Sequence, residues 1–94
     1  MPYMLVRHKV GDIAKWRPAF DEHASVRREA GFRGAQIFKN VDDPHEVITL
    51  FEVQDVERAR EFCRSEDLRR VMQRAGVTDR PDVFLLEEEG KTTV

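Results

Sequence analysis

Long apolar runs, an excess of charge of one sign and pairs of cysteines are all absent from this sequence of 94 residues. No stretch approaches the roughly 20 apolar residues that a membrane-spanning helix requires. The formal net charge is −2, and no block of Lys or Arg stands apart from acidic residues, which argues against nucleic-acid binding. The single cysteine, Cys63, cannot form an internal disulfide, which suits a reducing compartment. We therefore expect a cytoplasmic protein that engages neither nucleic acid nor a membrane.

Motifs for metal binding and covalent catalysis are missing as well. The three histidines, His8, His23 and His45, show no spacing that is diagnostic of a metal site. The chain has no glycine-rich phosphate loop and no nucleophile elbow. We expect no metal and no cofactor, so any chemistry depends on side chains that the fold brings together.

The residues that are present describe one small folded domain. Hydrophobic residues make up 40% and charged residues 36% of the chain, a balance typical of globular proteins rather than disordered ones. We expect a single domain over residues 1–94, with an ordered core over residues 3–88. The tail 89–94 is expected to be partly unstructured, as chain ends often are.

Apolar periodicity and turn residues divide the chain into four predicted strands and two helical segments. The predicted strands are Tyr3–Val10, Phe32–Val41, Glu46–Gln54 and Pro81–Glu88. The helical segments, 13–30 and 55–75, lie after the first and third strands. Ser65 is followed by two acidic residues, which predicts that a new helix begins there within the second segment.

Two prolines affect the predicted course of these elements. Pro18 lies inside the first helical segment, where it lacks an N–H and clashes with the preceding turn. We therefore expect the helix to restart or kink near Pro18. The stretch Asp42-Asp43-Pro44-His45 has the residues of a turn, so we expect Pro44 to lie in the loop of a β-hairpin.

The order of the elements, β-α-β-β-α-β, predicts a ferredoxin-like α+β fold with the helices on one face of the sheet. A sheet covered on one side only should alternate apolar and polar residues along its strands. In the third strand, however, Val47, Phe51 and Val53 face one way, while Ile48 and Leu50 face the other. Because nothing else in the chain can cover the second face, we predict a homodimer packed sheet to sheet.

The apolar stripe of the first helical segment contains two polar residues where Leu is usual. The stripe consists of Trp16, Ala19, Phe20, His23, Arg27 and Ala30. His23 is either a pocket histidine that moves a proton or hydrogen-bonds a ligand, or a buried histidine that the protein itself satisfies. Arg27 either holds an anionic or carbonyl-bearing ligand, or covers apolar surface with its stem while its head reaches solvent.

Three further residues belong to the candidate site. Trp16 and Phe20 are either plain core residues or the aromatic wall of a small-molecule pocket, and one residue can be both. His8 shares a face of the first strand with Val6 and Val10. That face turns either toward the pocket or toward the dimer interface, and the sequence leaves both directions open.

Four segments carry a resemblance to a known group of proteins. They are VRHKV at 6–10, WRPAFDEH at 16–23, FKNVDDPHEV at 38–47 and LRRVMQRAGV at 68–77. In these segments the chain resembles the dimeric α/β-barrel superfamily, which includes antibiotic-biosynthesis monooxygenase-like domains and some polyketide cyclases. The resemblance covers residues 3–88, and it implies a pocket between the helices and the concave sheet of each subunit.

The resemblance also implies a function. It points to a cofactor-free monooxygenase or a cyclase that acts on a hydrophobic aromatic or polyketide-like molecule. His23 would act as acid or base and Arg27 would contact an oxyanion, while Trp16, Phe20 and His8 would line the pocket. The alternative is a non-catalytic dimeric module that binds a small ligand or serves as an accessory protein. Haem degradation is not expected, because haem-degrading members have an Asn on the first strand and a Trp and a His on the second helix, which this chain lacks.

Overall fold

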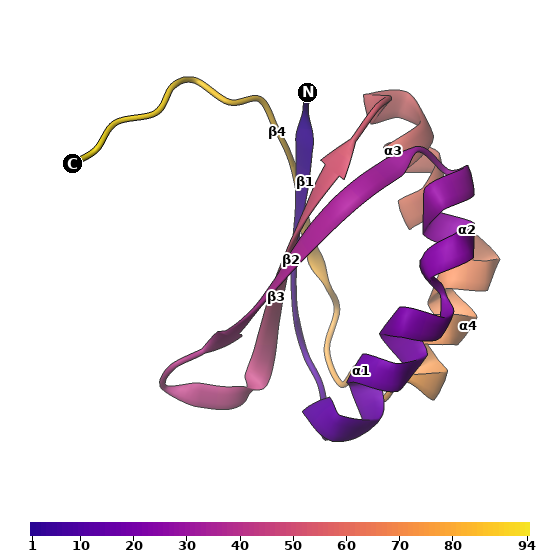
Figure 1. Ribbon diagram of the computed structural model, residues 1–94. Helices are drawn as coiled ribbons and strands as arrows, with labels where there is room; N and C mark the ends of the chain where they lie inside the picture. The colour runs from indigo at the N-terminus through magenta and orange to yellow at the C-terminus, as the bar shows by residue number, and fades with distance from the viewer.

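Four strands pair into one sheet in the computed structural model, which describes all residues of the chain (Figure 1). The strands are β1 (Tyr3–Lys9), β2 (Phe32–Asn40), β3 (Asp43–Val53) and β4 (Asp82–Leu86). Their order across the sheet is β2-β3-β1-β4, and every neighbouring pair is antiparallel. The central strands are therefore β3 and β1, in which buried residues alternate with less buried ones.

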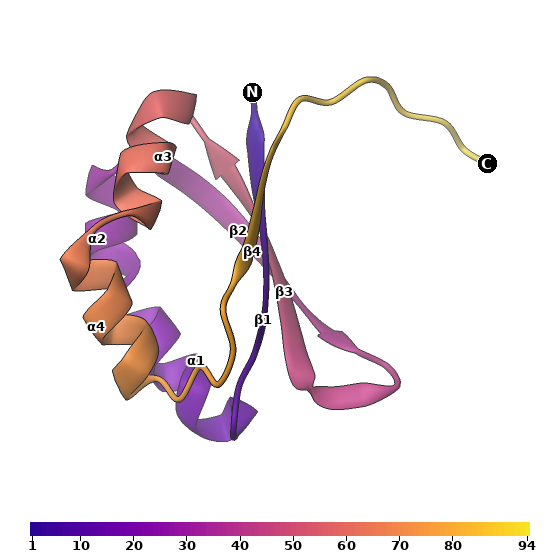
Figure 2. The same cartoon turned by 180° about the vertical axis from the view of Figure 1, so that it is seen from behind.

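Each predicted helical segment consists of two short helices. They are α1 (Ile13–Glu22), α2 (Ala24–Glu29), α3 (Val56–Cys63) and α4 (Glu66–Arg74). Figures 1 and 2 show all four on the same side of the sheet. The predicted α+β fold with ferredoxin-like element order is thus confirmed. None of the helices has the length and apolar character that crossing a membrane would demand.

Residues with specific end-capping chemistry fix where several elements begin and end. The Asp12 carboxylate accepts a hydrogen bond from the N–H of Ala14 at 2.9 Å, which caps α1. The Ser65 hydroxyl accepts one from the N–H of Leu68 at 3.2 Å, so α4 begins where the sequence predicts a new helix. Gly31 has a φ of 95°, a conformation that favours glycine, and it turns the chain from α2 into β2.

The first helical segment is interrupted at His23 rather than at Pro18. α1 continues through Pro18, and the break lies between α1 and α2. Pro18 falls in the second turn of α1, where the missing N–H removes a single intrahelical bond, to the carbonyl of Ala14. The expectation of a restart near Pro18 was therefore wrong.

Pro44 lies within β3 rather than in the hairpin loop, because β3 begins at Asp43, earlier than predicted. The loop consists of Val41 and Asp42, between the paired residues Asn40 and Asp43. The register of β2 against β3 shifts next to this pair, so Pro44 occupies an irregular stretch of the ladder. A proline there costs no regular interstrand hydrogen bond.

The two faces of the sheet are both apolar, as the sequence predicts. The covered face contributes most of the core: Met4, Val6, Val10, Val47, Phe51 and Val53 are buried. The open face exposes Phe38, Phe84 and Leu86, whose side chains are 49%, 53% and 39% accessible. Residues 87–94 form no helix or strand and leave the sheet on the side away from the helices (Figure 2).

Candidate functional site

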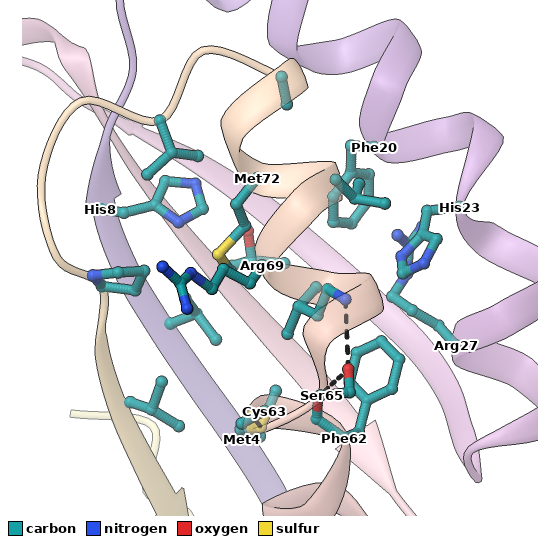
Figure 3. Close-up of a pocket in the computed structure, with 18 of the residues that line it drawn as sticks. Met4, His8, Phe20, His23, Arg27, Phe62, Cys63, Ser65, Arg69 and Met72 are labelled. Carbon is teal, nitrogen blue, oxygen red and sulfur yellow. Dashed lines mark hydrogen bonds between the residues drawn. The ribbon is translucent and has the colours of Figure 1, made fainter.

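A cavity of about 680 Å³ lies between the helices and the covered face of the sheet. All five residues of the predicted site line it: His8, Trp16, Phe20, His23 and Arg27. Figure 3 shows His8 on the sheet side, and Phe20, His23 and Arg27 on the side of the first two helices. The structure thus turns His8 toward the pocket, the direction that the sequence left open. A volume of this size suits a small-molecule ligand.

Two stacked aromatic rings, those of Trp16 and Phe20, form one wall of this cavity. Trp16 and Phe20 are four residues apart, so they lie on the same face of α1. Their ring centroids are 4.8 Å apart, with an angle of 30° between the planes. The edge of the His8 ring approaches Trp16 at 5.8 Å and 69°. Trp16 is buried and packs in the core, so it is both a core residue and part of the wall.

His23 is held in place by an acidic residue from the other helical segment. It lies at the junction of α1 and α2, 7% exposed, and its ring stacks on Phe62 with centroids 5.8 Å apart. Its Nε2 is 3.0 Å from Oδ2 of Asp67, in the first turn of α4. If Nε2–H donates to this carboxylate, Nδ1 is the nitrogen that can accept a proton. The pair has the base-and-orienting-carboxylate arrangement of a general base.

Arg27 brings a positive charge to the cavity without an acidic partner. Its guanidinium carbon is 3.7 Å from the centre of the Phe20 ring, a cation–π contact. No carboxylate forms an ion pair with Arg27, in contrast to Arg17 on α1, which pairs with Asp21 at 3.0 Å. Burial lowers the pKa of Arg27 to about 10, so the side chain is protonated at neutral pH. An anionic oxygen in the cavity would meet this charge in a setting of low dielectric.

The sheet side of the cavity carries two buried polar residues that have no hydrogen-bond partner. His8 is 4% exposed and Thr49 is 1% exposed. The two ring nitrogens of His8 form no hydrogen bond with the protein, and the hydroxyl of Thr49 forms none either. Burial lowers the pKa of His8, which favours a neutral imidazole, although Asp79 acts in the opposite direction.

Sequence reasoning missed Asp67 and Thr49 as parts of this site. In the sequence, Asp67 is only an acidic residue near a predicted helix start. Its hydrogen bond with His23 depends on how α4 packs against the junction of α1 and α2. Thr49 could have been found, because it continues the alternating buried set of Val47, Phe51 and Val53 on β3. A polar residue in such a set is a signal of a buried polar group.

Metal binding has no support from the side-chain arrangement. No group of three or more His, Cys, Asp or Glu side chains lies close enough together to hold a metal ion. Cys63 lines the cavity, but burial raises the pKa of its thiol, which disfavours the thiolate that binds metals and attacks substrates.

Comparisons with known proteins agree with this architecture. Among the solved structures with this fold is an antibiotic biosynthesis monooxygenase with 17% identity, covering 96% of this chain and 100% of that chain, with a TM-score of 0.69. SnoaB, a cofactor-independent oxygenase from Streptomyces nogalater, has 16% identity, covers 98% of this chain and 95% of its own, and has a TM-score of 0.70. The ActVA-Orf6 monooxygenase of Streptomyces coelicolor, solved with the ligand nanaomycin D, has 16% identity, coverage of 99% and 91%, and a TM-score of 0.68.

At these identities the solved structures establish a shared fold and nothing more. No protein with a curated description matches the chain in sequence. The family model described as antibiotic biosynthesis monooxygenase, however, matches residues 4–74, which is most of the chain. The matched segment includes all five residues of the predicted site. The chain therefore belongs to the antibiotic biosynthesis monooxygenase family.

Proposed function

We propose that the protein is a cofactor-free monooxygenase that oxidises a hydrophobic, aromatic or polyketide-like small molecule. The observation that carries this proposal is the unpaired Arg27, which lies beside an aromatic wall in a cavity of about 680 Å³. A cationic group without an acidic partner is suited to stabilising an anion that forms in the reaction. The description of SnoaB as a cofactor-independent oxygenase shows that this chemistry occurs on the same fold.

The reaction needs a substrate that can form a carbanion. A CH₂ group that is conjugated with a carbonyl, either directly or through aromatic rings, loses a proton to a base, and the electron pair moves onto the carbonyl oxygen. The resulting enolate reduces O₂, and a bond forms between the carbon and one oxygen atom. Loss of the second C–H proton and cleavage of the O–O bond then give a ketone and water. In total, CH₂ and O₂ become C=O and H₂O, so the substrate supplies all four electrons and O₂ accepts them.

His23 and Arg27 would divide this work. His23, oriented by Asp67 at 3.0 Å, is the base that accepts the first proton. Arg27 faces the enolate oxygen and stabilises its charge. Trp16 and Phe20 hold the flat ring system. A cyclase would use the same enolate to attack a carbonyl within the substrate, so the two activities differ in the substrate rather than in the site.

Anthrone is a suitable first probe because its CH₂ group lies between two aromatic rings. The protein would be mixed with anthrone at neutral pH, with O₂ consumption and anthraquinone formation followed together. We expect both to exceed the rate with heat-inactivated protein, with one labelled oxygen atom from isotopic O₂ in each quinone. Saturable binding of anthrone without product would contradict the monooxygenase and support the non-catalytic binding module instead.

We also propose that the open face of the sheet packs against the same face of a second copy. Phe38, Phe84 and Leu86 are exposed there, and no helix of the chain lies over them. Apolar area removed from water contributes roughly 25 cal/mol per Å², which would offset the small core of a chain of this length. One chain has a mass of 11.0 kDa, so native mass spectrometry should show a species at twice that mass. A monomer at micromolar concentration would contradict the homodimer.

A further inference from the structure

Two buried polar side chains on the sheet side of the cavity remain outside the proposed chemistry. His8 on β1 and Thr49 on β3 are almost fully buried, and both line the cavity. All three of their side-chain polar atoms lack a hydrogen-bond partner within the protein. Buried polar groups are rarely left in this state, because removal from water is unfavourable unless a new partner replaces it. Both residues line the cavity, so a group bound in the cavity is the nearest candidate for that partner.

The strand register brings these two residues together. Val6 is paired with Thr49 and His8 with Val47 across the two central strands. His8 and Thr49 are therefore diagonal neighbours on the same face, a separation at which one ligand atom can lie between them. In Figure 3 the His8 ring extends from β1 into the cavity, opposite the side that holds His23 and Arg27. The cavity thus has His8 and Thr49 on the sheet side and His23 and Arg27 on the side of the first two helices, while Arg69 of α4, paired with Glu66, also lines it.

The two places differ in the chemistry that they can bind. Arg27 is a cation and suits a negatively charged oxygen. A neutral imidazole has one donor and one acceptor, and a threonine hydroxyl can also donate and accept. This combination suits a hydroxyl group, which needs both an acceptor for its proton and a donor for its lone pair. The edge-on contact between His8 and Trp16 at 5.8 Å brings such a hydroxyl close to a flat ring on the aromatic wall.

We propose that His8 and Thr49 form a hydrogen-bonding subsite for a hydroxyl group carried by an aromatic ligand. The subsite rests on the proposed function, because it takes the aromatic ligand of the same cavity and narrows it to a hydroxylated one. The ligand is then a phenol or polyphenol with one neutral hydroxyl at the sheet and a second oxygen near Arg27. His8 and Thr49 select this ligand over an aromatic molecule without the hydroxyl.

A comparison of two matched probes tests the subsite without any need for turnover. β-Naphthol and β-methylnaphthalene have the same rings and differ in a hydroxyl against a methyl group. Their Kd values would be measured by NMR titration for the wild type, Thr49→Val and Thr49→Ser, with the ring signals of His8 as a local reporter. Thr78→Val, at an exposed position outside the cavity, is the matched control.

We expect the wild type to prefer β-naphthol by about tenfold, a typical contribution of one well-placed hydrogen bond. The preference should disappear in Thr49→Val, remain in Thr49→Ser and Thr78→Val, and be reduced in His8→Phe. Thr49→Val should also unfold at a temperature no lower than that of the wild type, because it removes a hydroxyl that has no partner in the protein.

Four outcomes would overturn the subsite. If Thr49→Val keeps the preference for β-naphthol, the hydroxyl does not bind at the sheet. If Arg27→Met abolishes the preference while Thr49→Val does not, the hydroxyl binds at the helix side. If both probes bind the wild type equally, the subsite is wrong while the proposed aromatic pocket stands. Failure of both probes to bind would contradict the proposed function itself, and the subsite with it.

Discussion

Two neighbouring residues of β1, Arg7 and His8, show how differently the two faces of the sheet treat polar groups. The Arg7 guanidinium, on the open face, contacts Glu46 at 3.0 Å, Asp79 at 2.9 Å and Asp82 at 2.8 Å. These bonds raise the pKa of Arg7 further above its ordinary value. On the covered face, neither ring nitrogen of His8 has a hydrogen-bond partner in the protein. Two adjacent residues therefore differ completely: the Arg7 side chain has three carboxylate partners, and the His8 side chain has no hydrogen-bond partner.

Apolar residues show the opposite distribution. On the covered face they are buried beneath the helices, and on the open face Phe38, Phe84 and Leu86 remain exposed. Each face therefore lacks something different: the covered face lacks polar partners, and the open face lacks an apolar cover. The first deficit matches a polar aromatic ligand, and the second matches a second copy of the chain. The site and the dimer can be tested separately because they use opposite faces of one sheet.

The largest effect is expected from His23, the residue proposed to move a proton on the covered face. Replacing His23 with Gln keeps an N–H donor for Asp67 but removes the basic nitrogen. We expect kcat on anthrone to fall by about a thousandfold, within the usual range for a general base. Asp67→Asn, which keeps an acceptor but loses the charge, should give a smaller loss. Turnover by His23→Gln equal to that of the wild type would remove the proposed role.

Arg27 should come next, because its charge acts on the enolate without moving a proton. Arg27→Met keeps a long apolar stem over Phe20 and removes the charge. We expect kcat to fall by roughly a hundredfold, as when one stabilising donor of an oxyanion is lost. Arg28→Met is the matched control, since Arg28 is adjacent, exposed and outside the cavity. Equal losses in both variants would show that the effect is general rather than local to the site.

On the open face, Phe84→Lys should weaken the proposed dimer. A charged side chain on this apolar face would have to be desolvated for the two sheets to pack. We expect a loss of about 2 kcal/mol of dimerisation free energy, roughly thirtyfold in Kd, as for a buried aromatic residue that contributes strongly to an interface. Analytical ultracentrifugation would measure it. Val41→Lys, in the hairpin loop, is the control, and an identical shift in both variants would argue against this face as the interface.

The faces and the candidate site could be predicted from sequence because both depend on local periodicity. The period of two on the strands separates Val47, Phe51 and Val53 from Ile48 and Leu50. The helical period groups the aromatic and polar residues of the stripe that now line the cavity. These patterns need no knowledge of distant contacts.

What could not be predicted depends on packing between distant segments. Asp67 is separated from His23 by 44 positions, and only the approach of α4 to the junction of α1 and α2 makes them partners. The break between α1 and α2 falls at His23, a position that a rule about Pro18 does not predict. The unpaired state of Thr49 is likewise a property of the whole cavity, since alternation reveals that a residue is buried but not what surrounds it.

The smallest expected effect concerns the ion pairs around Arg7. The N–H of Lys9 and the Arg7 guanidinium hold the pKa of Asp79 below its ordinary value of 3.8. A carboxylate with a lowered pKa in the folded state stabilises the fold above the unfolded value, and this contribution is lost as the pH falls through the folded pKa. Asp79→Asn should therefore lower Tm by a few degrees at neutral pH, as expected for partly exposed ion pairs.

The difference in Tm between the wild type and Asp79→Asn should begin to shrink as the pH falls below about 4, and it should vanish below the lowered pKa of Asp79, where both side chains are neutral. Thermal unfolding at a series of pH values would measure it, and titrating groups distant from Asp79 cancel in the comparison. Asp42→Asn, in the hairpin loop and without an ion-pair partner, should show no such trend. A Tm difference that stays constant from neutral to acid pH would mean that Asp79 acts through shape rather than charge. The ion pairs of Arg7 would then contribute no electrostatic stability. The comparison of Arg7 with His8 would in that case show a difference in contacts but not in energy.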